Sequence, residues 1–180
     1  MQPRISIITI CYNAASTITR TLRSVSAQTY PNIQYLIIDG ASKDNTLELV
    51  RELAPEAEVY SERDKGIYDA MNKGLDRATG DYVWYVNAGD ALASPTTVED
   101  LVRATCTGDS LPDVLYGDTR LIDAEDHDLG LRRLHPPHQL DWRSFRAGML
   151  VCHQAFVAKR SISPHYDLRY HFSADVDWCI

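Results

Sequence analysis

Short apolar runs alternate with stretches of helical periodicity through the first half of the chain. Residues 5–10 read Ile-Ser-Ile-Ile-Thr-Ile, and residues 35–38 and 82–86 are similar runs rich in β-branched and aromatic residues. A strand that is buried on both faces of a parallel sheet has this pattern. Between the runs, apolar residues such as Ile18 and Leu22 recur at helical spacing. The alternation predicts an α/β fold, an open and mostly parallel twisted sheet with helices on both faces.

Capping residues place further helices. Asp44 is predicted as the N-cap of one helix, because its short polar side chain can accept bonds from the free N–H groups of the first turn. Gly80 is predicted as the C-cap of a helix over residues 67–78. Ser94 and Pro95 predict the start of a later helix, with proline in the first helical position.

The remaining segments have a weaker pattern. Short strands are predicted at residues 59–61, 114–116 and 155–157. Residues 127–140 contain three His and two Pro without a clean period, which predicts a loop. Ser173 is predicted to cap a last helix.

Composition excludes several classes of protein. The chain has 180 residues, 44% hydrophobic and 24% charged, which is typical of one globular domain. Its net charge is −7 and it has no basic run, which disfavours binding to nucleic acid through the phosphate backbone. Its apolar runs are far shorter than the roughly 20 residues of a membrane span.

The cysteines and histidines indicate neither a disulfide framework nor a zinc site. The four Cys are widely spaced without a CxxC pair, and no signal-peptide layout precedes the first apolar run. We therefore expect reduced thiols in a cytoplasmic protein, with peripheral contact at the inner face of a membrane left open. His127, His135 and His138 lack the tight spacing of zinc ligands.

Polar and small residues follow each predicted strand of the first half. Ligands of open α/β sheets bind outside the carboxyl ends of the strands, so these residues are candidates for a binding site. They are Thr9, Cys11, Tyr12 and Asn13 at the first strand, Asp39, Gly40, Ser42 and Asp44 at the second, Glu62, Asp64, Lys65 and Gly66 at the third, and Asn87, Gly89 and Asp90 at the fourth.

The acidic residues of this set suit a nucleotide. The Asp39 carboxylate can accept hydrogen bonds from ribose hydroxyls or from the N–H of a base. Asp90 can hold a hard divalent cation, and that cation would neutralise a diphosphate on a chain of net charge −7. Neither GxGxxG nor GxxxxGK[ST] occurs, so a dinucleotide-binding turn and a P-loop are not indicated.

An ordered set of motifs resembles the family 2 glycosyltransferases, in particular bacterial exopolysaccharide and lipopolysaccharide sugar transferases. The motifs are SIITICYNA, YPNIQYLIIDGASKDNT, SERDKGIYDAMNKGLDRATGDYVWYVNAGD, YGD, CHQAF and SADVDW. The resemblance implies a single GT-A domain, with a nucleotide-sugar half at about residues 1–92 and an acceptor half at about residues 93–180. It also implies inverting transfer from a nucleotide diphosphate sugar, with UDP as the leading nucleotide and Mg²⁺ or Mn²⁺ as cofactor. The implied acceptor is a glycan or a lipid-linked glycan.

The same resemblance assigns roles to single residues. Asp90 falls in the place of the metal-binding DxD motif, and Asp175 in the place of the catalytic base. Contacts with acceptor or donor are assigned to His153, Gln154 and Asp177. Contacts with the nucleotide or donor are assigned to Thr9, Tyr12, Asn13, Asp39, Gly40, Ser42, Asp64, Gly66, Asn72 and Asn87.

Two motifs depart from the family pattern. The metal motif reads Asn-Ala-Gly-Asp, so Asp90 is its only carboxylate, and we expect metal binding to depend more on the diphosphate. The base motif reads Ala-Asp where many members have Glu-Asp, and Asp177 is the neighbouring acid. Asp175 would lie in the first turn of the last helix, where the helix dipole favours the ionised carboxylate that a base requires.

Two other functions stay open at this point. One is a nucleotide-sugar binding module without transfer activity. The other is a sugar nucleotidyltransferase, which is disfavoured because residues 11–15 read Cys-Tyr-Asn-Ala-Ala where that class has a Gly-rich basic loop. The last predicted helix stops at Ile180, which suggests a truncated catalytic core with a whole donor site and a partial acceptor site.

Overall fold

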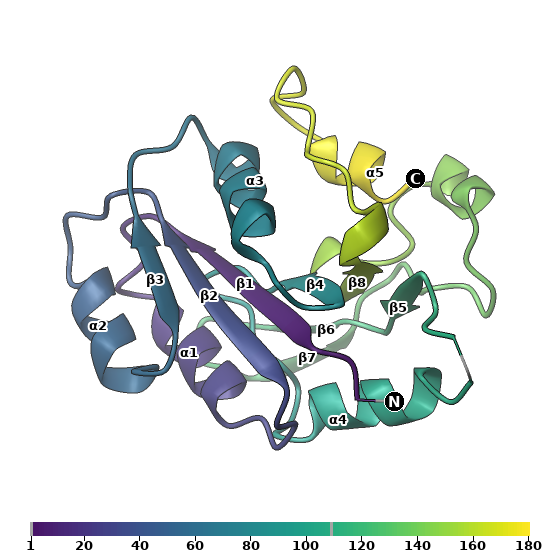
Figure 1. Cartoon of the computed structure of the whole chain (residues 1–180), viewed down its shortest axis with the longest axis horizontal. Helices are drawn as coiled ribbons and strands as arrows, with labels where there is room; N and C mark the ends of the chain where they lie inside the picture. The colour runs from purple at the N-terminus through teal and green to yellow at the C-terminus, as the bar shows by residue number, and fades with distance from the viewer. Residues whose placement is uncertain (1, 109) are drawn as a thin grey trace.

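The chain forms one six-stranded mixed sheet with helices on both faces (Figure 1). The computed structural model describes residues 2–108 and 110–180. The sheet order is β3-β2-β1-β4-β8-β5, in which β3, β2, β1 and β4 are parallel and β8 is antiparallel to its two neighbours. The predicted fold class is therefore confirmed. The strands are β1 (Ile5–Cys11), β2 (Ile33–Asp39), β3 (Glu58–Ser61), β4 (Tyr82–Tyr85), β5 (Val114–Tyr116) and β8 (Phe156–Lys159).

Strand β1 lies at the centre of the sheet and is buried along its whole length. Its side chains alternate between the two faces, so that Ile7 packs with one group of helices and Ile8 with the other. One face is covered by α1 (Ile18–Ser26), α2 (Thr46–Leu53) and α4 (Thr97–Thr105), and the other by α3 (Ile67–Arg77) and α5 (Ala174–Trp178). Within the described residues no helix is both long and apolar enough to span a bilayer.

The strand register brings the carboxyl ends of β1, β2 and β3 to one edge of the sheet. Cys11 lies opposite Asp39, and Asp39 lies opposite Ser61. The backbone beyond β4 continues the same pairing, because the Ala88 N–H donates to the Ile10 carbonyl at 3.2 Å. The loops after these four strands therefore meet at one place, as expected for a ligand site of an open sheet.

Two predicted helix starts are displaced in the structure. Helix α2 begins at Thr46 with Asn45 as its N-cap, one residue after Asp44. Helix α4 begins at Thr97, so Ser94 and Pro95 lie in the turn before it. The Pro95 carbonyl accepts a hydrogen bond from the backbone N–H of Thr29, outside the helix, at 2.9 Å.

The predicted loop at residues 127–140 contains a strand that sequence reading missed. Strands β6 (Arg120–Ile122) and β7 (Asp128–Leu131) form a separate two-stranded hairpin. Its strands are mostly exposed, so burial does not impose an alternating apolar pattern on the sequence. An ion pair between Arg120 and Asp128 joins the two strands. Three short 3-10 segments, η1 (Trp142–Ala147), η2 (His153–Ala155) and η3 (Arg160–Ile162), connect the later elements.

Gly80 has a different role from the predicted C-cap. Helix α3 ends at Arg77 and its C-cap is Ala78. Gly80 instead lies against β1, where its N–H donates to the Ser6 hydroxyl at 2.9 Å. A Cβ at this position would lie 2.7 Å from both the Arg4 carbonyl oxygen and the Ser6 nitrogen. Because both are backbone atoms, a side chain here would push β1 and the start of β4 apart.

We expect Gly80→Ala to destabilise the fold by about 2 kcal/mol, through overpacking against backbone. For a chain of this length that corresponds to a fall of about 4–8 °C in the melting temperature. Gly117→Ala is the matched control, because a Cβ there meets no atom within 4 Å. Equal melting temperatures for Gly80→Ala and the wild type would show that the contact is not limiting.

Candidate functional site

Hydrogen bonds hold the loop after β1 against the loop after β2. Asn13, whose φ of 47° is in the left-handed region that Asn tolerates, lies at the centre of this contact. Its N–H donates to the Ser42 hydroxyl, and its side-chain oxygen accepts from the Lys43 N–H, both at 2.8 Å. The two following amides also donate across, from Ala14 to the Thr46 hydroxyl at 2.8 Å and from Ala15 to the Asp44 carboxylate at 3.0 Å.

Asp39 is fully buried at the end of β2. Its carboxylate accepts bonds from the hydroxyl of Ser42, from the N–H of Ser42 at 3.0 Å and from the hydroxyl of Ser61 at 2.6 Å. The Cys11 thiol donates to Oδ1 of the carboxylate at 3.7 Å, and burial together with the Asp39 charge raises the pKa of that thiol. Protein donors thus occupy both oxygens of the Asp39 carboxylate, and a ligand hydroxyl would have to replace one of these donors.

A polar pocket of about 260 Å³ lies beside these loops. The Tyr12 side chain, which is 61% exposed, forms part of its wall. Gly40 allows the wall to close, because a Cβ there would lie 2.6 Å from Asp64 Oδ2 and 3.3 Å from the Tyr12 ring. Asp64 is oriented by the N–H of Gly66, which donates to Oδ1 at 2.9 Å from a backbone with φ of 124°. The structure thus brings Tyr12, Gly40 and Asp64 together.

Two cationic residues of this pocket were missed by sequence reading. Lys43 and Arg63 line it, and neither side chain has an ion-pair partner among residues 2–108 and 110–180. Both lie in the strand-end loops, but the sequence reading selected their neighbours there, Ser42 and Asp44 after the second strand and Asp64 and Lys65 after the third. Basic residues in those loops, on a chain of net charge −7, were the available signal.

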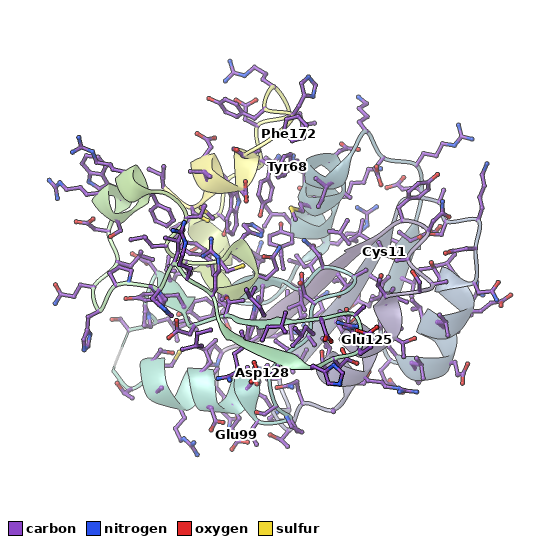
Figure 2. The ribbon with its side chains drawn as sticks, turned by 180° about the vertical axis from the view of Figure 1, so that it is seen from behind. Cys11, Tyr68, Glu99, Glu125, Asp128 and Phe172 are labelled. Carbon is purple, nitrogen blue, oxygen red and sulfur yellow. The ribbon has the colours of Figure 1, made fainter. Side chains whose placement is uncertain are left out.

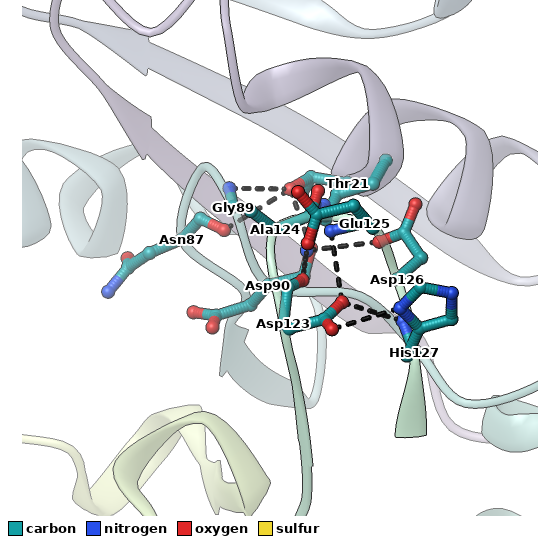
Figure 3. Close-up of polar contacts among 10 residues, drawn as sticks. Thr21, Asn87, Gly89, Asp90, Asp123, Ala124, Glu125, Asp126 and His127 are labelled. Atoms are coloured by element: carbon teal, nitrogen blue, oxygen red, sulfur yellow. Dashed lines mark hydrogen bonds and ion pairs between the residues drawn. The ribbon is translucent and has the colours of Figure 1, made fainter. Parts of the chain in front are cut away.

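The turn after β4 is shaped by Thr21 of helix α1. The Thr21 hydroxyl donates to the Asp90 carbonyl at 2.6 Å and accepts from the Gly89 N–H at 3.0 Å. Gly89 has a φ of 106°, which favours glycine. Figure 3 shows the side chains of Asn87 and Asp90 extending to the same side of this turn, away from Thr21.

The oxygens of this turn fit a divalent cation. Among the described residues no side chain forms a hydrogen bond or an ion pair with the Asp90 carboxylate. Burial raises its pKa above the ordinary value, and this effect outweighs a backbone hydrogen bond from Asn87 that lowers it. The Asn87 side-chain oxygen is a buried atom that has no hydrogen-bond partner in the described part of the chain. An unpaired buried oxygen loses its water without a compensating bond, and a hard cation supplies that compensation.

A second cluster of acidic residues lies at the tip of the β6–β7 hairpin, and hydrogen bonds within the turn account for its close spacing. Asp123, Glu125 and His127 place one oxygen or nitrogen each within 4.8 Å of one another. The Asp123 carboxylate already accepts the N–H of Glu125 at 3.0 Å and the N–H of His127 at 2.8 Å, and it pairs with the His127 ring at 3.0 Å. These bonds close the turn without a metal ion.

Asp175 lies in the first turn of α5, where the sequence placed it, and is half-buried. The phenol of Tyr68, from the first turn of α3, donates to Asp175 Oδ1 at 3.2 Å. Asp177 is exposed on the same short helix. The carboxylate of Asp175 therefore keeps one oxygen without a partner among the described residues.

Two residues with predicted nucleotide contacts are occupied elsewhere. Thr9 is fully buried, and its hydroxyl donates to the Val86 carbonyl at 2.7 Å, so it supports the end of β4. Asn72 uses both polar atoms of its side chain on the backbone of Tyr166, at 3.0 and 2.7 Å. Direct contact of either side chain with a ligand is not available in this structure.

His153 belongs to the core and is only 4% exposed. Its Nε2 lies 2.7 Å from the Tyr166 hydroxyl, and burial lowers its pKa to about 4. The side chain of the neighbouring Gln154 accepts from the Cys152 thiol at 3.0 Å. An aromatic core encloses the His153 ring, so its predicted contact with donor or acceptor would require this core to open.

The fold is that of an α/β protein of the GT-A type, with polar loops gathered at the carboxyl ends of its parallel strands. The family model described as "Glycosyl transferase family 2" matches residues 6–165, and the chain belongs to this family. It is a glycosyltransferase, and the resemblance seen in the sequence is confirmed.

Similar proteins include one curated relative and two solved structures. A PGL/p-HBAD biosynthesis glycosyltransferase of Mycobacterium bovis is 32% identical over 187 residues, covering 99% of this chain and 69% of the relative. S. aureus TarS 1-349 with UDP matches with a TM-score of 0.63 at 16% identity, over 98% of this chain and 54% of that chain, which shows the fold alone. A mannosyltransferase from Pyrobaculum calidifontis, in complex with GDP-Man and Mn²⁺, matches with a TM-score of 0.53 at 29% identity, over 57% of this chain and 32% of that chain. The chain thus spans about half or less of these solved structures.

The buried His153 makes a prediction for stability against pH. Because the folded state lowers its pKa from 6.5 to about 4, the unfolded chain binds the proton first as pH falls. We expect this residue to reduce the free energy of unfolding between pH 6.5 and 4, by about 1.4 kcal/mol per pH unit at most. Urea unfolding at pH 7, 6, 5 and 4.5 measures the slope.

His153→Phe should flatten that slope, and His138→Gln should leave it unchanged. His138 is the matched control because it is exposed and forms no ion pair with the described residues. An unaltered slope in His153→Phe would mean that another group governs stability in this range.

Proposed function

We propose that this chain transfers a sugar from a nucleotide diphosphate sugar, with UDP as the leading nucleotide, to a hydroxyl of a glycan or lipid-linked glycan. The observation that carries the proposal is the buried Asn87 side-chain oxygen, which has no partner among the described residues, on the same side of the turn as the partly buried Asp90 carboxylate. This turn lies at the sheet edge that also forms the polar pocket. The mannosyltransferase structure with GDP-Man and Mn²⁺ supports this class of donor. The biosynthetic name of the mycobacterial relative supports a glycolipid or glycan acceptor.

The pocket would receive the nucleoside. The exposed ring of Tyr12 offers a face on which a base can stack. Asp64 offers an oxygen at the pocket wall, and Asp39 offers one when a ligand hydroxyl replaces Ser42 or Ser61. The positive charges of Lys43 and Arg63 would attract the diphosphate toward the pocket.

Asp90 and the amide oxygen of Asn87 would hold Mg²⁺ or Mn²⁺. When bound, the cation would supply electrostatic stabilisation of the negative charge that grows on the leaving diphosphate. Asp90 must be ionised to act as a ligand, and its raised pKa makes the site sensitive to acid. Thr21 would keep the turn in place through its bonds to Asp90 and Gly89.

Asp175 would act as the general base. The acceptor oxygen bonds to C1 of the sugar from the face opposite the diphosphate, which inverts the configuration at C1. As that bond forms, the acceptor hydroxyl loses its proton to the carboxylate. The C1–O bond to the diphosphate breaks with its electron pair, which leaves with the nucleotide.

Asp90→Asn tests the cation site. We expect Mn²⁺ to strengthen UDP binding to the wild type about tenfold or more in isothermal titration calorimetry, and to have no such effect on the variant. In EDTA the variant should melt at a higher temperature, because it lacks a desolvated charge. The sign follows from the raised pKa of Asp90, since a folded state that binds the proton more tightly loses stability as pH rises through that pKa.

Glu52→Gln on the exposed side of α2 is the matched control, with the Mn²⁺ response of the wild type expected. An undiminished Mn²⁺ effect in Asp90→Asn would remove Asp90 from the cation site.

Asp175→Asn tests the base. We expect kcat to fall by about 10²-fold or more while UDP affinity stays unchanged, because general-base catalysis contributes about 10²–10⁴-fold. UDP release from UDP-glucose, UDP-galactose and UDP-N-acetylglucosamine, with p-nitrophenyl glycosides as acceptors, measures turnover. Asp76→Asn, a matched change on the exposed side of α3, should retain activity. Wild-type turnover by Asp175→Asn would exclude its role as base.

A further inference from the structure

Asp175 has one hydrogen-bond donor among the described side chains, the phenol of Tyr68. The donor comes from α3 and the acceptor from α5, which are 107 positions apart in the chain. The O–O distance is 3.2 Å and involves Oδ1 of the carboxylate. Figure 2 shows Tyr68 between α3 and the segment that leads from Phe172 into α5. This contact directly joins α3, whose start adjoins the polar pocket, to the Asp175 carboxylate.

The Tyr68 ring is fixed by a stack of aromatic side chains. It stacks on Tyr166 with ring centroids 5.6 Å apart, and Tyr166 stacks on Trp178 of α5 at 5.2 Å. The Trp178 indole N–H donates to the Pro164 carbonyl at 2.7 Å. Asn72 of α3 binds both backbone groups of Tyr166. The helices that carry Tyr68 and Asp175 therefore pack against the same aromatic cluster, which consists of Tyr68, Tyr166 and Trp178.

The titratable groups that face Asp175 are neutral around pH 7. Burial raises the pKa of Tyr68 and Tyr166, and the charge of Asp175 adds to both effects. Burial lowers the pKa of His153 to about 4 and raises that of Cys179 to about 12. None of these four groups supplies a positive charge. Among the described side chains, the Tyr68 phenol is therefore the one that stabilises the ionised carboxylate, in addition to the N-terminal turn of α5.

We propose that Tyr68 is a positioning residue, whose phenol holds Oδ1 of Asp175 and leaves Oδ2 to take the proton of the acceptor hydroxyl. The inference rests on the proposed function of Asp175 as base. A hydrogen bond to the charged form of a carboxylate favours that form, which is the form able to accept a proton. Rotation of the carboxylate is also restricted, so one lone pair is directed toward the acceptor side.

The place of Tyr68 in the chain gives this contact a second consequence. Gly66 precedes it by two residues and orients Asp64 in the polar pocket. The loop that lines the pocket and the residue that holds the base therefore belong to one continuous segment at the start of α3.

Tyr68→Phe tests the proposal, because it keeps the ring stacked on Tyr166 and removes one O–H. With the donor–acceptor pair that the wild type turns over fastest in the UDP-release assay, we expect kcat to fall about tenfold. This is the effect of losing one hydrogen bond to a charged group. UDP affinity and the KM for the donor should stay unchanged, and the acid limb of the kcat profile should move to higher pH.

Carboxyl ¹³C NMR of Asp-labelled protein gives a readout that needs no acceptor. The Asp175 signal is assigned by its loss in Asp175→Asn. We expect the pH at which this signal changes by half to be higher in Tyr68→Phe than in the wild type. A merely structural role of the ring would leave both this pH and the acid limb unchanged.

Tyr60→Phe is the matched control, because the Tyr60 phenol also donates to a carboxylate, Glu58, at 3.2 Å but lies on β3. It should leave kcat, the acid limb and the Asp175 signal as in the wild type. Unchanged behaviour of Tyr68→Phe, with Asp175→Asn inactive, would overturn the role of Tyr68 and leave the proposed function intact. Full activity of Asp175→Asn would instead overturn the base itself.

Discussion

The buried carboxylate of Asp39 sets the arrangement at the ends of the parallel strands. A charge that is fully removed from water is tolerated only when hydrogen bonds replace the lost hydration. Ser42 and Ser61 supply these bonds from the loop after β2 and from β3, and they can reach because Asp39 is in register with Ser61. The hydrogen bonds to the Asp39 carboxylate thus fix where the loops after β2 and β3 begin. Residues of those two loops line the polar pocket.

A different kind of packing governs the opposite part of the sheet edge. There Tyr166 and Trp178 stack on each other and form an aromatic block. The indole N–H of Trp178 is satisfied by a hydrogen bond to the Pro164 carbonyl. Helix α3 belongs to both regions, since its start adjoins the pocket and its first turn contacts Asp175. The two regions therefore share one rigid element, although they are stabilised by different interactions.

Much of the fold follows from the sequence, because burial on both faces leaves uninterrupted β-branched runs such as that of β1. The strand-end residues of the site were predictable because the ends of these apolar runs mark the ends of the strands. Sequence alone does not show which polar atoms are already used, and Asn72 is occupied by a backbone 94 residues away. The core position of His153 likewise depends on aromatic partners from distant segments. The β6–β7 hairpin has no alternating apolar pattern in the sequence, because both faces of its strands are mostly exposed to solvent.

Helix α1 has a consequence for how the rim of the site can move. Arg20 donates to the carbonyls of Asp123 and Ala124 and pairs with Asp126, so it anchors the hairpin tip, while the next residue, Thr21, holds the turn of Asp90. Two adjacent positions of one helix thereby hold both the hairpin tip and the Asp90 turn. A displacement of α1 would therefore shift these two parts of the rim together.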